Sequence, residues 1–265
     1  MMVKITILND DRNNNCNLDS EHGFSLYIEV NDNKLLMDAG QSDIYLKNAS
    51  KLGINLDDVD AFMLSHGHYD HGNGLKYYNK KVKMIMHPNC ISSRTSKRSG
   101  NYAGINQSVE ELNEKFDLVM TKDTYKVCDN VYFLGEIDRN TEFEAKEFPT
   151  TNSDGSDDIA MDDTGCAIIT DKGIIVISGC AHSGICNTIE HAKKVTNENR
   201  VLAVIGGFHL KTINESCIKT IEYFKDNNIE RIYVGHCSSD IVCEEFIKQI
   251  GSDVKVMSVG ETYTF

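Results

Sequence analysis

The residues best suited to chemistry are three histidines and an aspartate within six positions, in the run His66-Gly67-His68-Tyr69-Asp70-His71. Imidazole and carboxylate groups are the ligands that suit zinc, iron or manganese. Two histidines one residue apart can point at one ion, and the pair Asp70 and His71 can reach a second. Because a solvated loop has no reason to concentrate imidazoles in this way, we interpret the run as a binding site for one or two metal ions.

Such a site needs further ligands, and three other histidines are placed to supply them. His182, His209 and His236 each follow an apolar run that predicts a strand, namely 173–177, 201–205 and 231–234. Small residues precede each of these histidines, which lets the backbone come close to a bound group. Active sites of layered α/β folds gather at such strand ends, so we expect the histidines to lie near a common site.

The elements that would position these side chains are short strands and four helices. A strand over 61–64 ends directly before the histidine run, and the first half of the chain predicts a meander of strands. In the second half strands alternate with segments that repeat apolar residues at helical spacing. The four predicted helices are 43–52, 183–195, 215–227 and 239–250. Strands and helices mixed in this way favour sheets covered by helices.

Two segments of low apolar content, 92–108 and 150–163, are predicted to be loops and are candidate lids. The first carries Arg94, which we consider as a contact for an anionic substrate, with an ordinary solvated loop as the alternative. The second ends in Asp162-Asp163, which we interpret as surface acidity, with entry into the site as the alternative because the pair precedes a strand. Outside both loops, Glu21 and His22 precede a strand and are candidate substrate contacts.

Charge and cysteine usage narrow the class of protein. The formal net charge is −13, which would repel nucleic acid, so no nucleic-acid partner is expected. The nine cysteines include no Cys-x-x-Cys pair, so we predict reduced, mostly buried thiols in a cytoplasmic protein rather than a zinc ribbon. No stretch of about 18 apolar residues or signal-peptide pattern is present, so no membrane association is expected.

The histidine run resembles the HxHxDH motif of the metallo-β-lactamase superfamily. Asp38, in Leu36-Met37-Asp38-Ala39-Gly40, resembles the first motif of that superfamily, while His182 and His236 resemble the third and the last. More narrowly, several short segments resemble proteins similar to dihydropterin-ribofuranosylaminobenzene phosphate synthase. These segments are 21–25, 135–137, 178–187 and 206–210.

This resemblance implies a single α+β domain over 1–265, an αββα sandwich of two mixed sheets flanked by helices. It implies that Asp38 holds a ligand histidine by a hydrogen bond. It also implies two sets of ligands, His66, His68 and His182 for one ion and Asp70, His71 and His236 for the other.

One departure from the family pattern concerns the second ion. Many members with two metals have a bridging aspartate after the strand that follows the third histidine, but residues 201–210 contain no carboxylate. The second ion would then bind more weakly or through different ligands. His209 is the nearest polar side chain, and we rank substrate contact or general acid first, metal ligand second and a structural role third.

Together these patterns predict a metal-dependent hydrolase, or a related dihydropterin synthase-like enzyme, that activates water with one or two Zn²⁺ ions. Iron and manganese are alternative metals. Asp70 would orient the nucleophile, and His209 or His22 would protonate the leaving group. The expected substrate is an anionic small molecule, phosphorylated or pterin-like, and assembly into an oligomer is left open. The competing hypotheses are a di-iron redox protein on the same fold and a non-catalytic metal-binding module.

Overall fold

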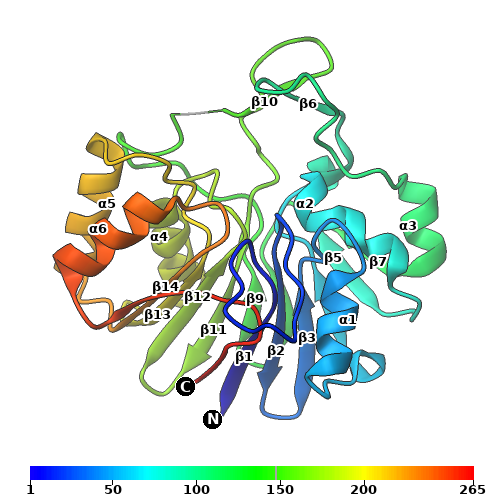
Figure 1. The fold of residues 1–265 in the computed structure, drawn as a ribbon, viewed down its shortest axis with the longest axis horizontal. Helices are drawn as coiled ribbons and strands as arrows, with labels where there is room; N and C mark the ends of the chain where they lie inside the picture. The colour runs from blue at the N-terminus through cyan, green and yellow to red at the C-terminus, as the bar shows by residue number, and fades with distance from the viewer. Residues whose placement is uncertain (147) are drawn as a thin grey trace. The chain divides into compact units, whose positions relative to one another are not determined.

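The structure is a computed structural model that describes residues 1–146 and 148–265. These residues fold into two compact units. Unit 1 contains residues 1–122, 148–158 and 258–265, and unit 2 contains 123–146 and 159–257. Each unit contains a seven-stranded mixed sheet with helices packed on it (Figure 1). The α+β class with two mixed sheets flanked by helices is therefore confirmed, while the single domain over 1–265 stays a prediction.

The sheet of unit 1 joins an antiparallel half to a parallel half in the order β16-β1-β2-β3-β4-β5-β7. The first four of these strands are antiparallel, and β3, β4, β5 and β7 are parallel. The parallel half therefore has its carboxyl ends at one edge. The strands are β1 (Val3–Asn9), β2 (Ser25–Val30), β3 (Asn33–Met37), β4 (Ala61–Met63), β5 (Lys83–Met86), β7 (Asp117–Met120) and β16 (Thr262–Thr264).

Strand β4, which leads into the histidine run, is anchored by aromatic packing. Phe62 is fully buried and meets the rings of Tyr78 and Phe116 edge-on, at centroid distances of 5.6 and 6.1 Å. Such pairs contribute about 0.5–1.5 kcal/mol each beyond the area that they bury. The helices of this unit are α1 (Ile44–Lys51), α2 (Tyr69–Gly72) and α3 (Val109–Lys115), with 3₁₀ turns η1 (Leu56–Asp58), η2 (Asn73–Tyr77) and η3 (Pro88–Ile91).

The two segments predicted to be loops contain a short strand each, and these strands pair with one another. β6 (Arg94–Ser96) and β10 (Thr150–Asn152) form an antiparallel two-stranded sheet in unit 1. Helix α3 follows the first segment and was not among the predicted helices. Its start has a capping box, in which Ser108 and Glu111 bond each other's backbone N–H groups. Whether either segment acts as a lid stays a prediction.

Unit 2 is built of an antiparallel part followed by strand–helix–strand units. Its sheet has the order β15-β14-β13-β12-β11-β9-β8, and β12 to β15 are parallel. Figure 1 shows α4, α5 and α6 together on one face of this sheet. The elements are β8 (Tyr125–Cys128), β9 (Val131–Phe133), β11 (Gly165–Thr170), β12 (Gly173–Ser178), α4 (Ile185–Thr196), β13 (Val201–Gly206), α5 (Glu215–Asp226), β14 (Arg231–Val234), α6 (Asp240–Ile250) and β15 (Val254–Val256).

The predicted helices at 43–52, 183–195, 215–227 and 239–250 correspond to α1, α4, α5 and α6 within two residues at each end. Among the described residues, no helix is both long enough and apolar enough to cross a bilayer.

Candidate metal centre

The histidine run forms the connection from β4 to α2 in unit 1. His68 has extended backbone angles and is the N-cap of α2, so Asp70 and His71 lie on the first turn of that helix. Gly67, between the first two histidines, packs directly on the chain at Cys90. A Cβ atom at position 67 would lie 1.8 Å from the Cys90 carbonyl oxygen. Only glycine therefore fits between the two histidines.

The donor atoms of unit 1 converge in two pairs. His66 Nε2 lies 3.0 Å from His68 Nδ1, and His71 Nε2 lies 3.7 Å from Asp70 Oδ2. Two ligands bonded to one tetrahedral zinc ion at about 2.0–2.1 Å are separated by roughly 3.3 Å. All four side chains are buried. The structure thus brings together the residues that the sequence assigned in pairs to a first and a second ion.

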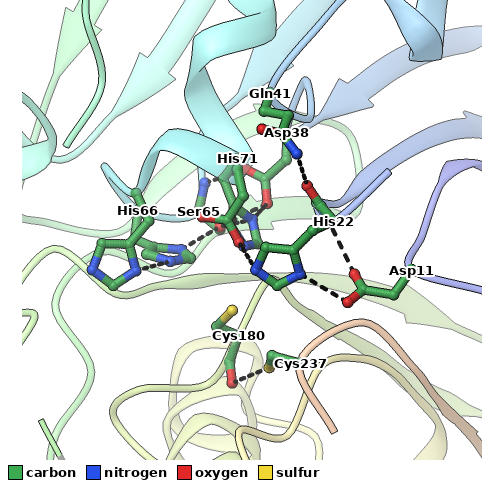
Figure 2. A network of polar contacts seen from close by, with 12 residues as sticks. Asp11, His22, Asp38, Gln41, Ser65, His66, His71, Cys180 and Cys237 are labelled. Atoms are coloured by element: carbon green, nitrogen blue, oxygen red, sulfur yellow. Dashed lines mark hydrogen bonds and ion pairs between the residues drawn. The ribbon is translucent and has the colours of Figure 1, made fainter. Parts of the chain in front are cut away.

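A buried carboxylate organises both pairs (Figure 2). Asp38 Oδ1 accepts the backbone N–H of Ser65 at 2.7 Å, and its Oδ2 accepts from Ser65 Oγ and His71 Nδ1, each at 2.7 Å. Because Ser65 gives its only hydroxyl proton to Asp38, its oxygen must accept from His66 Nδ1, at 2.9 Å. Both rings therefore carry their proton on Nδ1, which leaves the lone pair on Nε2. Asp38 sets the tautomer in which each histidine can bind a metal.

His22 links this cluster to a second carboxylate. Its Nδ1 lies 2.8 Å from Asp11 Oδ2, and its Nε2 lies 3.2 Å from Asp70 Oδ2. About half of the His22 side chain is exposed, whereas Asp70 is buried. The sequence indicated roles for His22 and Asp70 separately, and the structure places the two side chains in contact. Asp11 was not among the residues predicted from the sequence.

Two other predicted substrate contacts are occupied by interactions within unit 1. Glu21 Oε1 accepts the backbone N–H groups of Gln41 and Ser42, at 3.1 and 2.9 Å, and so holds the turn after β3. Arg94 is buried, with Nε 3.1 Å from Asp158 Oδ2. Its charge is thus balanced inside the protein, and the substrate roles of both residues stay predictions.

In unit 2 the carboxyl ends of three parallel strands are tied together by backbone bonds. Gly207 N–H donates to Gly179 O at 3.0 Å, and Gly235 N–H donates to Gly206 O at 3.1 Å. The loops after β12, β13 and β14 are thereby held side by side, as expected for the ends of parallel strands. These loops carry the predicted site residues His182, His209 and His236.

His182 and His209 lie next to each other and line a cavity of about 120 Å³ in unit 2. Their ring centroids are 4.3 Å apart. Lys146, Lys211 and Glu144 also line this cavity, so its lining carries two cationic side chains and one acidic side chain. This position fits the expected role of His209 as a substrate contact or proton donor.

Two cysteines that sequence analysis took for ordinary buried thiols lie beside His236. One donor atom each from Cys180, His236 and Cys237 lie within 4.8 Å of one another. Burial opposes ionisation of Cys237, but a hydrogen bond from the Cys180 side chain and the positive charges of His236, His209 and Lys211 hold the pKa of Cys237 well below its ordinary value. Burial instead raises the pKa of Cys217, to about 11. Cys180 and Cys237 each lie within two residues of a predicted ligand histidine in the sequence, and this spacing was the signal that could have identified them.

Buried acids hold the start of α4, beside the same cavity. Glu144 accepts the backbone N–H groups of Cys186 and Asn187 at 2.8 and 2.9 Å, and burial raises its pKa. Asp163 accepts the N–H of Ser183 at 2.8 Å, and burial raises its pKa to about 6. The interpretation of Asp162-Asp163 as surface acidity was wrong, because both side chains are buried.

Three candidate site residues, and Ala181 beside His182, have left-handed backbone angles. Asp38 has a φ of 60° in unit 1, and Ala181, His209 and His236 have φ values of 56°, 51° and 41° in unit 2. This conformation costs a residue other than glycine about 1–3 kcal/mol. Strain of this kind persists where the surrounding structure fixes a side chain for function.

The donor chemistry in each unit fits a divalent cation. Unit 1 offers paired imidazole and carboxylate donors, with the tautomers of His66 and His71 fixed by Asp38 and Ser65. Unit 2 offers imidazole and thiol donors at strand ends. Zinc takes nitrogen, oxygen and sulfur ligands of these kinds.

Comparisons with known proteins give the family. The chain is 32% identical to the 7,8-dihydropterin-6-methyl-4-(β-D-ribofuranosyl)-aminobenzene-5'-phosphate synthase of Methanocaldococcus jannaschii, over 93% of this chain and 90% of that protein. It is 36% identical to an uncharacterised protein of the same organism, over 83% and 84% of the two chains. The family described as anti-Pycsar protein Apyc1 matches residues 20–127.

Among solved structures, a metal-dependent hydrolase of the β-lactamase superfamily superposes with a TM-score of 0.84 at 27% identity, covering 98% of both chains. The sequence match, the shared fold and the HxHxDH run agree, and the chain belongs to the metallo-β-lactamase superfamily, in the group of the dihydropterin-ribofuranosylaminobenzene phosphate synthase.

Proposed function

We propose that this protein is a metal-dependent enzyme of hydrolytic type that acts on a phosphorylated or pterin-like small molecule. The observation that carries the proposal is the pair of imidazole nitrogens of His66 and His68, 3.0 Å apart and buried, with Asp38 fixing the tautomer of His66 through Ser65. Histidines that bind a metal are held by supporting hydrogen bonds of this kind. The proposed ligands are His66, His68 and His182 for one ion and Asp70, His71 and His236 for the other.

A bound divalent ion would lower the pKa of water from about 15.7 to near 7 and polarise the bond under attack. The residues of the chain supply the remaining functions. Asp38 keeps His66 and His71 in the ligating tautomer. Asp70, in contact with His22, would orient the attacking water. His209 lines the cavity of unit 2 and would contact the substrate or protonate its leaving group.

The substrate class is inferred from charge and from the relatives. Lys146 and Lys211 line the cavity that holds His209, together with Glu144, whose carboxylate accepts N–H groups at the start of α4. The two cationic side chains favour an anionic ligand. The name of the Methanocaldococcus jannaschii synthase contains both a dihydropterin and a 5'-phosphate. A small phosphorylated molecule with or without a pterin ring is therefore the first substrate to test.

The test is a screen of zinc-loaded protein against phosphomonoesters, phosphodiesters, lactones and dihydropterin derivatives. We expect turnover of a phosphorylated compound that is abolished in His68→Ala and retained in Asp60→Asn, which alters an exposed carboxylate at the opposite end of β4 from the run. His209→Gln should keep the metal and lower kcat by about 10²- to 10⁴-fold, the usual contribution of a proton donor. Loss of metal from His209→Gln would instead identify His209 as a ligand.

Metal analysis separates this proposal from its competitors. Colourless protein purified with zinc supports the hydrolytic enzyme. Stoichiometric iron with visible absorbance would favour the di-iron redox protein, and metal without any turnover across the panel would favour the binding module.

A further inference from the structure

Unit 2 contains its own set of metal donors, made of two thiols and one imidazole. One donor atom each from Cys180, His236 and Cys237 lie within 4.8 Å of one another, and all three side chains are buried. In Figure 2 both cysteines lie close together, with the thiol of Cys237 donating to the Cys180 carbonyl oxygen at 3.5 Å. Three donors at such spacing could bind the same ion.

These two thiols differ in their surroundings from three other buried cysteines of the unit. Cys186, Cys217 and Cys243 belong to the apolar core cluster under α4, α5 and α6. Cys180 and Cys237 are buried at the strand ends that carry His182 and His236. Each of the two therefore lies within two residues of a candidate ligand histidine.

The backbone is shaped to admit the sulfur of Cys237. A Cβ atom on Gly207 would lie 2.6 Å from Cys237 Sγ, so only glycine leaves room for the thiol in this position. The residues next to the two thiols, Ala181 and His236, both have left-handed backbone angles. Gly207 and the two left-handed residues therefore hold both thiols in defined positions at neighbouring strand ends.

The sequence also lacks an anionic ligand where the family usually has one. Residues 201–210 contain no carboxylate, and His236 is the one ligand proposed in unit 2 for the second ion. Thiolates are anionic ligands of the borderline-soft divalent cations, and zinc binds two cysteines and one histidine with a fourth position left for another ligand.

We propose that Cys180 and Cys237 bind a zinc-type divalent cation together with His236 and supply the anionic ligands that the missing aspartate would provide. This inference rests on the proposed function in one respect, since His236 is a ligand in both. Each thiol that binds gives its proton to the solvent, so the two thiolates balance the charge of the ion.

The experiment uses cobalt as a spectroscopic probe. Reduced, metal-free protein is titrated with Co²⁺, and thiolate-to-cobalt charge transfer is measured in the near ultraviolet. We expect this absorption in the unsubstituted protein, weaker in Cys180→Ala and in Cys237→Ala, and absent in the double variant. Cys186→Ala is the matched control, because it removes a buried thiol of the same unit and should leave the spectrum unchanged.

X-ray absorption of the unsubstituted zinc protein gives a second measurement that does not depend on how the variants fold. We expect sulfur neighbours at about 2.3 Å from one zinc. Zinc bound with nitrogen and oxygen neighbours alone, or a cobalt charge-transfer band that survives in the double variant, would overturn the inference while the proposed function stands. Protein that binds neither metal would contradict the proposed function as well.

Discussion

Replacing Asp38 by asparagine should damage metal binding through the tautomers of two histidines. Oδ1 must remain an acceptor for the Ser65 N–H, so the new amide nitrogen takes the place of Oδ2 and donates to Ser65 Oγ and His71 Nδ1. His71 then carries its proton on Nε2. Ser65, no longer donating to residue 38, donates to His66 Nδ1, and that ring also moves its proton to Nε2.

Each histidine thereby loses the lone pair with which it would bind an ion. Loss of such a supporting partner typically costs 10- to 100-fold in metal affinity, which corresponds to about 1.4–2.7 kcal/mol for each ion. If the amide instead keeps its oxygen toward His71, its NH₂ group opposes the Ser65 N–H, and the protein loses about 1–3 kcal/mol of stability.

The assay is a competition titration of Zn²⁺ against a chromophoric chelator, together with thermal unfolding of the metal-free protein. The control is Asp60→Asn, whose carboxylate also accepts a backbone N–H, from Lys34 at 2.8 Å, but is exposed. Both orientations of the amide predict a loss. An Asp38→Asn protein whose zinc affinity is within twofold of the unsubstituted protein, and whose free energy of unfolding is within 0.5 kcal/mol of it, would therefore refute this explanation.

Three further predictions concern burial and packing. Arg94→Met should lower the free energy of unfolding, measured by chemical denaturation, by about 3–5 kcal/mol, because it leaves Asp158 buried without its ion pair. Gly67→Ala should abolish metal binding or folding, because the new Cβ would lie 1.8 Å from the Cys90 carbonyl oxygen. Metal analysis and circular dichroism measure the two outcomes. Glu144→Ala should destabilise the start of α4 by about 0.5–2 kcal/mol. Because burial raises the pKa of Glu144, the folded protein binds its proton more tightly, so this destabilisation should shrink as pH rises above about 4.5.

Each of these has a contradicting outcome. Arg94→Met with unchanged stability and lost substrate affinity would show that the arginine serves the substrate and not the ion pair. Gly67→Ala with normal metal content would mean that the run can shift away from residue 90. A destabilisation by Glu144→Ala that grows between pH 4.5 and pH 7 would mean that the carboxylate is preferred in the folded state.

The elements were largely predictable because their signals are local. Apolar periodicity located α4, α5 and α6 within two residues, and the apolar runs before His182, His209 and His236 are strands. Helix α3 was missed because its signal is a polar capping box and not an apolar stripe. The pairing of β6 with β10 joins segments more than 50 residues apart, which no local pattern could indicate.

The candidate site was predictable where its residues are adjacent in the sequence. The run from His66 to His71 can be recognised directly in the sequence. The place of Cys180 beside Cys237 and His236 instead depends on which strands are neighbours in the sheet. Arg94 stood out as a cation in an acidic chain, but composition does not reveal that Asp158 neutralises it in the interior. Burial and partner choice are properties of the packed protein, and the charge of a residue in the sequence does not reveal them.

The most direct test of the central claim measures metal content and turnover in the same preparation. Zinc-loaded protein should contain one or two ions per chain and hydrolyse a phosphorylated or pterin-like small molecule, and His66→Ala with His68→Ala should lose the ion and the turnover together. Full turnover by protein stripped of metal, or an unchanged metal content in that double variant, would contradict the assignment of this site.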